Sequence, residues 1–387
     1  MSKRRMTRSD GKNTNAEDAG PAGVVLGVET SCDDTAAALV RRRADGSADI
    51  LSNVVWTDYD DHAAFGGVVP EIAARSHVER IDRVIARAFA EAGMTIADID
   101  AVAATAGPGL IGGVMVGLTA AKAVAMAANV PLIPINHLEG HALTVRMTDR
   151  AQFPFLLLLI SGGHTQLVWV TGLGEYQRLG STIDDAAGEA FDKTAKLLGL
   201  GQPGGPRVEA AAVGGKADRY DLPEPLKQRD GCDFSFSGLK TAVREIAEQD
   251  GNGLKGMTGQ DVADLAASFQ FAAARHLAQR TEKAIRAVAV KPGEGRLVVA
   301  GGVAANCAIR SHLSSICERN GWRLIAPPAK FCTDNAAMIA WAGAERLFTG
   351  MAPALDEALA FAPRARWPLA PPPEGQAIGG GRKGPKA

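Results

Sequence analysis

The 387-residue sequence lacks the cysteine spacings that mark disulfide-rich and zinc-ribbon proteins. It has five cysteines, an odd number, and no two of them form a C-x-x-C pair. They are Cys32, Cys232, Cys307, Cys317 and Cys332. Scattered cysteines in an odd number are typical of a reducing compartment and not of a disulfide framework. We therefore expect a cytoplasmic protein.

Long apolar runs and an excess of one charge are also missing. No apolar run approaches the roughly 20 residues that span a bilayer, so we expect no membrane segment. The 42 basic and 43 acidic side chains nearly balance, so net charge does not draw the whole chain to nucleic acid. A nucleic-acid partner would need a local basic patch or a second protein.

The composition predicts a folded body between two polar ends. Hydrophobic residues make up 46% and charged residues 22% of the chain, which is ordinary for a globular protein. A chain of 387 residues favours two domains or one bilobal unit. Residues 1–23 predict a disordered tail, although Arg4, Arg5 and Arg8 leave an organelle transit peptide open. The Pro/Gly/Lys-rich stretch 363–387 predicts a second tail.

The segment INHLEGH, residues 135–141, contains two histidines four residues apart. It comes at the end of the apolar run 130–135, which predicts a buried strand. On a helix, His137 and His141 would lie on one face, about 5–6 Å apart. Two imidazoles at that spacing can share one metal ion. Two surface histidines on an exposed helical turn are the other interpretation, and the pattern alone does not decide between them.

A zinc protease is disfavoured by the position of the acid in this segment. In H-E-x-x-H proteases the general base lies next to the first histidine, and in inverted forms next to the second. Here the acid, Glu139, lies midway. Residues two apart on a helix point to nearly opposite faces, so Glu139 is expected to point away from a metal on His137 and His141.

Two strand–turn–strand units are predicted. The apolar runs 24–28 and 36–40 flank a polar turn that contains Glu29 and Asp33, and the runs 155–160 and 166–170 flank a turn that starts at Ser161. Each turn could meet a phosphate or a metal-bound ligand, or could be an ordinary solvated turn. The repetition predicts a duplicated α/β architecture with a cleft between two lobes.

Other stretches predict the helices and strands that complete this architecture. Apolar spacing predicts helices over 70–92 and 261–290 and within 180–200, and a Gly-rich loop opens a further helix that ends near residue 128. Strands are expected over 99–104 and 296–300. The second of these ends in a Gly-Gly turn that leads to Asn306 and a helix, an arrangement that places ligands at helix N-termini. Asp334 precedes another helix, and its spacing favours a helix cap over a metal ligand.

A dense set of motifs resembles one family over residues 24–368. The motifs are ETSCDDT, GGVVPEIAARSH, TAGPGL, NHLEGH, LISGGHTQL, STIDDAAGEAFDKTAKLLGL, PGGP, DFSFSGLKTA, AGGVAAN and FCTDNAAMIA. Together they resemble the TsaD family, also called Gcp, the bacterial tRNA threonylcarbamoyltransferases. The resemblance implies an actin/Hsp70/sugar-kinase-like α/β fold with mixed sheets in two lobes and a nucleotide cleft between them. Lobe I would comprise 24–135 and about 333–362, and lobe II 136–332.

The resemblance also implies a metal site and a substrate site. It implies that His137, His141 and Asp334 bind one divalent metal, with Fe²⁺ expected and Zn²⁺ left open because both suit these ligands. The implied substrate is threonylcarbamoyl-AMP. The residues implied to lie along it are Leu159, Ile160, Ser161, Gly162 and Gly163. Those implied to hold its adenosine are Asp192, Gly205, Glu209 and Asn306.

The implied reaction moves the threonylcarbamoyl group to the N6 amine of the adenosine 3′ of the anticodon in tRNAs that read ANN codons, and AMP leaves. No feature of the sequence names a general base, and Asp33 and Glu29 are the candidates.

Family partners would be a TsaB-like paralogue, a TsaE-like ATPase and a TsaC-like adenylate-forming enzyme. Two rivals stay open: an ATP-dependent kinase or ATPase on the same fold, which the histidine pair disfavours because Mg²⁺ prefers oxygen ligands, and a non-catalytic nucleotide-binding scaffold.

Overall fold

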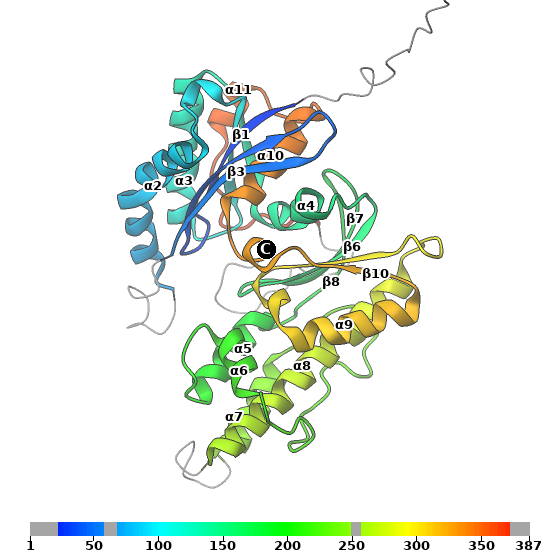
Figure 1. The fold of residues 1–387 in the computed structure, drawn as a ribbon. Helices are drawn as coiled ribbons and strands as arrows, with labels where there is room; N and C mark the ends of the chain where they lie inside the picture. The colour runs from blue at the N-terminus through cyan, green and yellow to red at the C-terminus, as the bar shows by residue number, and fades with distance from the viewer. Residues whose placement is uncertain (1–21, 58–67, 249–256, 372–387) are drawn as a thin grey trace, which may run out of the picture.

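The computed structural model describes residues 22–57, 68–248 and 257–371 (Figure 1). The predicted N-terminal tail lies outside these residues except at its end, where Gly23 already belongs to the first strand. The sixteen final residues of the second predicted tail, 372–387, also lie outside them.

Two five-stranded mixed sheets form the framework of the molecule. The strands of the first sheet are β1 (Gly23–Glu29), β2 (Thr35–Arg42), β3 (Ala48–Trp56), β4 (Ala101–Gly107) and β5 (Leu132–Asn136). Those of the second are β6 (Phe155–Ile160), β7 (Thr165–Gly172), β8 (Glu175–Ser181), β9 (Arg296–Ala300) and β10 (Arg323–Ile325). The spatial orders are β3-β2-β1-β4-β5 and, read in the same sense, β8-β7-β6-β9-β10.

The two orders are the same, which confirms the predicted duplication. In each sheet the central strand pairs antiparallel with the next strand of the chain, β1 with β2 and β6 with β7. On its other side it pairs parallel with a strand that follows a helical crossover, β4 or β9. Apolar residues fill both faces of β1 and β6, because strands covered by helices on both faces are apolar throughout.

The helices cover these sheets and complete the core. Their bounds are α2 (Pro70–Ala92), α3 (Ile111–Ala128), α4 (His137–Asp149), α5 (Ala187–Leu197), α6 (Gly204–Ala211), α7 (Ser237–Glu248), α8 (Gly259–Ala287), α9 (Cys307–Asn320), α10 (Ala336–Phe348) and α11 (Leu355–Ala360). Single turns of 3₁₀ helix are η1 (Ile96–Asp98), η3 (Gly302–Ala305) and η4 (Ala329–Phe331). Helices α2 and α3 cover one face of the first sheet, and α10 covers the other (Figure 1).

Helix α4 lies between the two sheets. Its Leu143 packs into the core that α10 shares with the first sheet. Leu138 and Val145 pack against Leu157 and Leu159 of β6 in the second sheet. The helix that carries the two predicted metal-binding histidines is therefore held from both lobes.

Three strands were not predicted from the sequence. They are β3, β8 and β10, and each lies at or next to an edge of its sheet. Edge strands mix polar with apolar residues, and β8 has only two fully buried positions, so their apolar signal is weak. The stretch 105–107, expected in a loop, belongs to β4.

Residues 363–371, assigned to a tail from their composition, form an extended strap across the molecule. The amide of Arg364 donates to the carbonyl of Ala106 at 2.8 Å. The side chain of Asn136 donates to the carbonyl of Trp367 at 2.9 Å. Beyond it, Leu369 packs against the core beside the second sheet. Pro, Gly and Lys content alone did not reveal this packing.

Among the described residues, α3 is long and apolar enough to cross a membrane by length and composition, with a mean hydropathy of 1.6. This corrects the expectation that no segment reaches that threshold. In this structure the buried side of α3, which includes Val114, Leu118 and Ala121, packs into the core of the first lobe. A third of the helix is buried in this way, and a helix of this length and composition also occurs in the cores of proteins that do not span a membrane.

Candidate metal centre and substrate site

Helix α4 begins directly at His137, where β5 ends. The side-chain oxygen of Asn136 accepts a hydrogen bond from the amide of Leu138 at 2.9 Å, which caps the helix. The side chains of His137 and His141 are almost fully buried, at 8% and 1% exposure. The interpretation as exposed surface histidines is therefore wrong.

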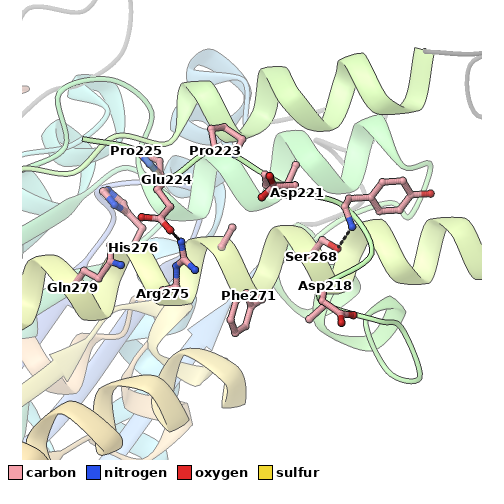
Figure 2. A pocket seen from close by; sticks show the side chains of 14 residues that line it. Asp218, Asp221, Pro223, Glu224, Pro225, Ser268, Phe271, Arg275, His276 and Gln279 are labelled. Carbon is pink, nitrogen blue, oxygen red and sulfur yellow. Dashed lines mark hydrogen bonds and ion pairs between the residues drawn. The ribbon is translucent and has the colours of Figure 1, made fainter. Parts of the chain in front are cut away.

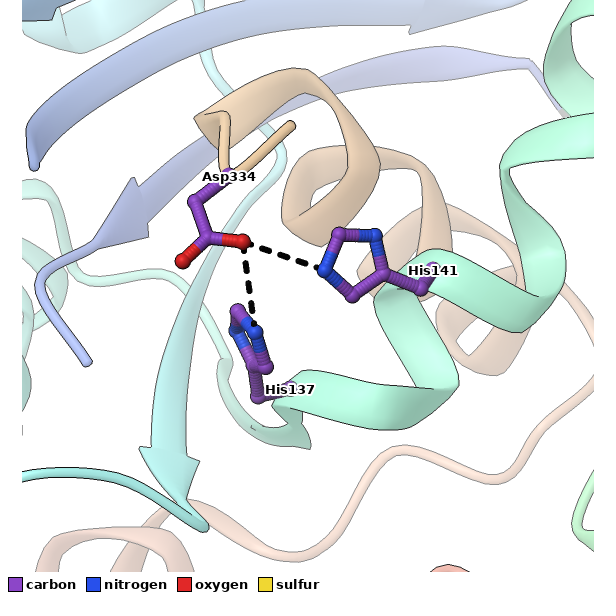
Figure 3. Close-up of side chains that lie close together, drawn as sticks. All are labelled: His137, His141 and Asp334. Carbon is purple, nitrogen blue, oxygen red and sulfur yellow. Dashed lines mark hydrogen bonds and ion pairs between the residues drawn. The ribbon is translucent and has the colours of Figure 1, made fainter. Parts of the chain in front are cut away.

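The two imidazoles converge on one carboxylate oxygen (Figure 3). Asp334 Oδ1 lies 3.1 Å from His141 Nε2 and 3.5 Å from His137 Nε2. One potential ligand atom from each of the three residues lies within 4.8 Å of the others. The three residues predicted as metal ligands thus meet in space, although 193 positions separate His141 from Asp334.

Asp334 is free for this role because its neighbour caps the following helix. The side chain of Asn335 accepts from the amide of Met338 at 3.0 Å and is the N-cap of α10. The spacing had favoured Asp334 as the cap, and the structure corrects this. An aspartate and an asparagine in sequence offer two equivalent caps, and only the fold selects between them.

A second carboxylate holds the ring of His137 from behind. Glu29, fully buried at the end of β1, lies with Oε2 3.0 Å from His137 Nδ1. A hydrogen bond from Nδ1–H to this carboxylate fixes the tautomer that leaves Nε2 as a ligand. Glu29 had been a candidate base, and its burial behind the imidazole assigns it to positioning His137.

The charges of the group show that it suits a cation. Burial lowers the pKa of His137, but the nearby Glu29 and Asp334 carboxylates outweigh burial and raise this pKa to about 9. Burial raises the pKa of Asp334, but the charge of His137 and the hydrogen bond from His141 hold it well below its usual range. Without a metal, the carboxylates thus retain a proton on the imidazole, and a divalent cation would replace that proton.

The convergence of two imidazole nitrogens and a carboxylate oxygen fits a divalent transition metal. This ligand set is borderline in softness and suits iron, zinc or similar ions. These three residues would hold the ion, and Glu29 would support His137 through the hydrogen bond to its Nδ1.

His164, which follows the second polar turn, is a residue that the sequence analysis did not single out. Burial lowers its pKa to about 3, with a further contribution from the charges of His137 and His141. Its Nε2 is buried and, among the described residues, has no hydrogen-bond partner. A neutral imidazole with an unused nitrogen beside the metal group can receive a substrate atom. The motif SGGHT contained it, but only the fold shows that its Nε2 is buried.

Glu139 points away from the metal group, as the helix geometry predicted. Its carboxylate accepts hydrogen bonds from Arg346 at 2.8–3.2 Å and from the hydroxyl of Tyr176 at 3.0 Å. A carboxylate committed to a partly buried guanidinium is unavailable to activate water at the metal. The zinc-protease interpretation therefore lacks its general base.

The second polar turn offers backbone groups and open space. Leu159 and Ile160 are fully buried in β6, so a ligand could reach only their backbone. The amide of Ser161 donates to the carbonyl of His164 at 2.8 Å and closes the turn. No atom lies within 4 Å of where a Cβ would stand on Gly162 or Gly163. These residues can therefore admit a ligand to the backbone.

The residues expected to hold adenosine gather at two helix N-termini. Asp192 Oδ1 accepts from the amide of Gly204 at 2.7 Å, next to Gly205 at the start of α6. Glu209 Oε1 accepts from the amide of Cys307 at 2.7 Å, at the start of α9. Asn306 caps α9 through a hydrogen bond from Ile309 and donates to Gln270 at 2.8 Å. The structure thus brings these four residues together, but gives three of their side chains internal partners.

Asp33, the candidate base, lies in the first turn and is partly exposed. Its neighbour Asp34 has the more unusual environment. Burial raises the pKa of Asp34 to about 7, and the hydroxyl of Thr57 donates to it. Asp33 and not Asp34 was named from the sequence, because no local pattern reveals which of two adjacent aspartates accepts a hydrogen bond from the hydroxyl of Thr57.

A separate cavity of about 270 Å³ lies between the 217–225 loop and α8 (Figure 2). It is lined by residues such as Asp218, Glu224, Phe271 and Arg275. An ion pair between Glu224 and Arg275 crosses it. None of the predicted site residues lines this cavity, so it is distinct from the metal group.

Comparison with known proteins identifies the family. The sequence profile described as "TsaD: tRNA N6-adenosine threonylcarbamoyltransferase" matches residues 49–341. A relative from Chelativorans sp. (strain BNC1), named tRNA N6-adenosine threonylcarbamoyltransferase, is 59% identical over 94% of this chain and 99% of its own. One of the same name from Rhizobium meliloti (strain 1021) is 58% identical, also over 94% and 99%. The chain belongs to this family.

Membership confirms the family resemblance and the function that it implied, transfer of a threonylcarbamoyl group to the N6 amine of adenosine in tRNA. The fold is confirmed independently. A solved structure of full-length HypF superposes with a TM-score of 0.55 at 12% sequence identity, over 88% of this chain and 48% of HypF. This likeness concerns the fold alone, and it agrees with the expected actin/Hsp70/sugar-kinase-like architecture. The kinase, scaffold and protease alternatives are accordingly set aside.

Proposed function

We propose that this chain transfers the threonylcarbamoyl group from threonylcarbamoyl-AMP to tRNA at a site formed by His137, His141 and Asp334 with one Fe²⁺ ion. The tRNA acceptor would be the adenosine 3′ of the anticodon in tRNAs that read ANN codons. The observation that carries the proposal is the convergence of the two imidazole Nε2 atoms on Asp334 Oδ1 at 3.1 and 3.5 Å. Zn²⁺ is the alternative metal, because the ligand types suit both ions.

The open second turn supports a place for the substrate. Ser161, Gly162 and Gly163 would lie along the threonylcarbamoyl-phosphate part, because the two glycines leave room for a ligand beside the backbone. Asp192, Gly205, Glu209 and Asn306 would surround the adenosine. The N-termini of α6 and α9 lie in that region, and the positive end of each helix dipole favours the negative charge of the AMP phosphate.

In the proposed reaction, the N6 amine attacks the carbonyl carbon of the threonylcarbamoyl group. A C–N bond forms, the bond from this carbon to the phosphate oxygen breaks, and AMP leaves with the electron pair. When bound, the divalent ion supplies Lewis-acid polarisation of a substrate oxygen. The chain itself orients the acyl group along the second turn and keeps Nε2 of His137 aimed inward through Glu29.

The amine must lose one proton as the bond forms. We propose Asp33 in the first turn as the acceptor, because it is partly exposed and lies two residues after Ser31, whose hydroxyl is 3.1 Å from His137 Nδ1. Its partly buried neighbour Asp34 is the second candidate, because a carboxyl with a pKa raised to about 7 is well matched to proton transfer near neutral pH.

The protein would act in the cytoplasm with partners. A TsaC-like enzyme would supply the adenylate, and a TsaB-like paralogue and a TsaE-like ATPase would complete the assembly. Exposed apolar side chains on α2 and α3 support a partner of the first lobe: Val78 is 63%, Met115 50% and Met126 62% exposed. Met115 and Met126 are eleven residues apart, about three turns, so they share one face of α3, and exposed apolar residues gathered on one face are typical of a protein interface.

The test is a reconstituted transfer assay with tRNA, labelled threonine, bicarbonate, ATP and the partner proteins. His137→Ala is expected to lose bound metal and at least 100-fold in transfer, whereas His312→Ala, a histidine of α9 away from the group, should keep both. Asp334→Asn is a second variant that preserves side-chain shape. Thermal melting checks that each variant is folded.

Two outcomes would overturn parts of the proposal. Full transfer by a folded, metal-free His137→Ala variant would remove the Lewis-acid role. ATP consumption without label in tRNA, in the presence of every partner, would favour an ATPase on the same fold.

A further inference from the structure

A basic groove of about 480 Å³ lies between α5 and α7 in the second lobe. Its lining residues are Lys193, Lys196, Leu197, Lys240, Thr241 and Arg244. Four of these six side chains are cationic. Since the chain as a whole has a formal net charge of −1, such a concentration of positive charge is a local feature.

Two of the four cations are partly neutralised inside the molecule. Lys193 pairs with Asp185 at 2.9 Å and with Glu189 at 2.7 Å. Lys240 pairs with the other oxygen of Asp185 at 3.0 Å. Burial lowers the pKa of Lys193, but hydrogen bonds and charges from both carboxylates raise it overall, so this side chain stays charged at neutral pH.

The other two cations, Lys196 and Arg244, are exposed and form no ion pair with any residue in the described ranges. Four cations against two carboxylates leave the groove with an excess of positive charge. The internal pairs hold Lys193 and Lys240 in place, and the unpaired side chains are available to a ligand. An anion would gain contacts with Lys196 and Arg244 without breaking an internal ion pair.

Helix α5 connects this groove to the substrate turn. At its first turn the amide of Ala187 donates to the hydroxyl of Thr165 at 2.8 Å, and the amide of Gly188 to the carbonyl of Ser161 at 3.2 Å. At 1.5 Å of rise per residue, Lys196 lies about 12 Å along the helix from Gly188. A polyanion with one nucleotide at the Ser161 turn would therefore have further phosphates within reach of the groove.

We propose that the basic groove binds the phosphate backbone of the tRNA substrate while the reacting adenosine lies at the Ser161 turn. The inference rests on the proposed function, and it adds a substrate contact outside the metal group. Lysines and arginines that neutralise phosphates release counterions, so their contribution is independent of base sequence and depends strongly on salt. The groove would thus contribute affinity and position, and the reaction site would select the base.

The test compares two double variants in the assembled enzyme. Lys196→Glu/Arg244→Glu reverses the two unpaired cations of the groove. Lys291→Glu/Arg323→Glu is the matched control, because it reverses two exposed cations before β9 and on β10, the edge strand remote from α5 and α7 (Figure 1). The probe is unmodified tRNA that reads an ANN codon, and its Kd is measured at several salt concentrations.

The groove variant is expected to weaken tRNA binding at least 10-fold and to reduce the slope of log K against log salt by about two. Its KM for tRNA should rise while kcat at saturating tRNA stays near that of the wild type. The control variant should change Kd less than 2-fold. AMP binding, measured on the same samples, should be unchanged in both variants.

Three results would overturn the inference. One is an unchanged tRNA Kd and salt slope in the groove variant. Another is an equal loss in the control, which would mean that only net charge matters. The third is loss of a protein partner with tRNA affinity retained, which would make the groove a protein-docking surface. If the wild type binds tRNA but transfers nothing, the proposed function fails while the binding comparison still decides the groove.

Discussion

The two strand–turn–strand units occupy equivalent places in their sheets, yet their turns differ. The first turn, residues 30–34, is packed from several sides. The hydroxyl of Thr30 donates to the carbonyl of Gly113 at 2.8 Å, and the carbonyl of Ser31 accepts from the amide of Leu110 at 2.7 Å. The second turn, residues 161–164, closes mainly on itself, and its two glycines face open space.

This difference separates two tasks in a duplicated architecture. The first turn is a support, because Ser31 within it and Glu29 directly before it both lie against the Nδ1 of His137, and because Gly113 of α3 holds Thr30. The second turn is a receiving surface, because no atom lies within 4 Å of where a Cβ would stand on Gly162 or Gly163. Duplication supplied two equivalent turns, and packing around one of them left the other free for substrate.

The largest expected effect comes from the support. Glu29→Gln keeps the shape of the side chain but removes the charge that holds the imidazole of His137. Loss of such an outer contact typically weakens metal binding 10–100-fold, and we expect a loss in that range by equilibrium metal titration. Glu345→Gln is the control: this buried carboxylate pairs with Arg146 instead, so the variant should lose stability but keep its metal affinity. Equal affinity in the Glu29 variant and wild type would contradict the supporting role.

Next in size is a test of packing at the first turn. In Gly117→Ala, the added methyl group would overlap the hydroxyl of Thr30. Overpacking of this kind costs about 1–3 kcal/mol, partly offset because alanine favours helix by about 1 kcal/mol. Urea denaturation should show a net loss of unfolding free energy. A variant at least as stable as the wild type would show that the packing around Thr30 can admit the added methyl group.

The matched change at the second turn is Gly162→Ala. Here a Cβ meets nothing within 4 Å, and Gly162 is not among the glycines with positive φ. Stability should therefore stay within about 0.5 kcal/mol of the wild type, as at other exposed sites, while transfer falls roughly 10-fold because the methyl group narrows the approach to the backbone. If kcat/KM for the adenylate is the same in Gly162→Ala and the wild type, the proposal that the second turn contacts the substrate is contradicted.

The smallest expected effect concerns proton binding by the first turn. Burial raises the pKa of Asp34 to about 7, so the folded state retains a proton on this carboxyl that the unfolded chain has already lost. The contribution of this group to stability therefore falls as pH rises from about 4 to 7. Asp34→Asn should be relatively more stable as pH rises through that interval, by roughly 1–3 kcal/mol at pH 7 and above.

The measurement is urea denaturation of chelator-treated protein across this pH range. Asp45→Asn is the control with the opposite sign, since hydrogen bonds from Ser47 lower the pKa of that exposed carboxyl. The contribution of the Asp45 carboxylate to the stability of the wild type increases as pH rises. Asp45→Asn should therefore become less stable relative to the wild type as pH rises. If the unfolding free energies of the wild type and Asp34→Asn change with pH in parallel, the raised pKa of Asp34 is contradicted.

Much of the fold was predictable because buried central strands are continuous apolar runs. The strands 155–160 and 296–300 and the helix 70–92 were placed at the bounds that the structure shows. Strand β8 was missed, because its polar residues carry no strong period. Short-range sequence patterns thus predicted the central strands of each sheet, but they did not predict edge strands such as β8.

The metal group was predictable only in part from its own residues. The pair His137 and His141 is visible as a spacing within one helix, whereas Asp334 joins them only through the family resemblance and, here, through the fold. Glu29 and His164 owe their environments to contacts across the chain, which no local pattern contains. Burial decides what each of these side chains does, and burial is a property of the assembled structure.

The position of α10 and the strap bears on how the protein is made. Ribosomes deliver the N-terminal end first, and domains can fold as they emerge. Here the first sheet cannot cover one of its faces until α10, ending at Phe348, has been synthesised. Asp334 and the strap bonded to Asn136 also come late. The first lobe is thus begun at the start of translation and completed near its end, so nascent chains of this protein carry an open hydrophobic sheet while the whole second lobe is made.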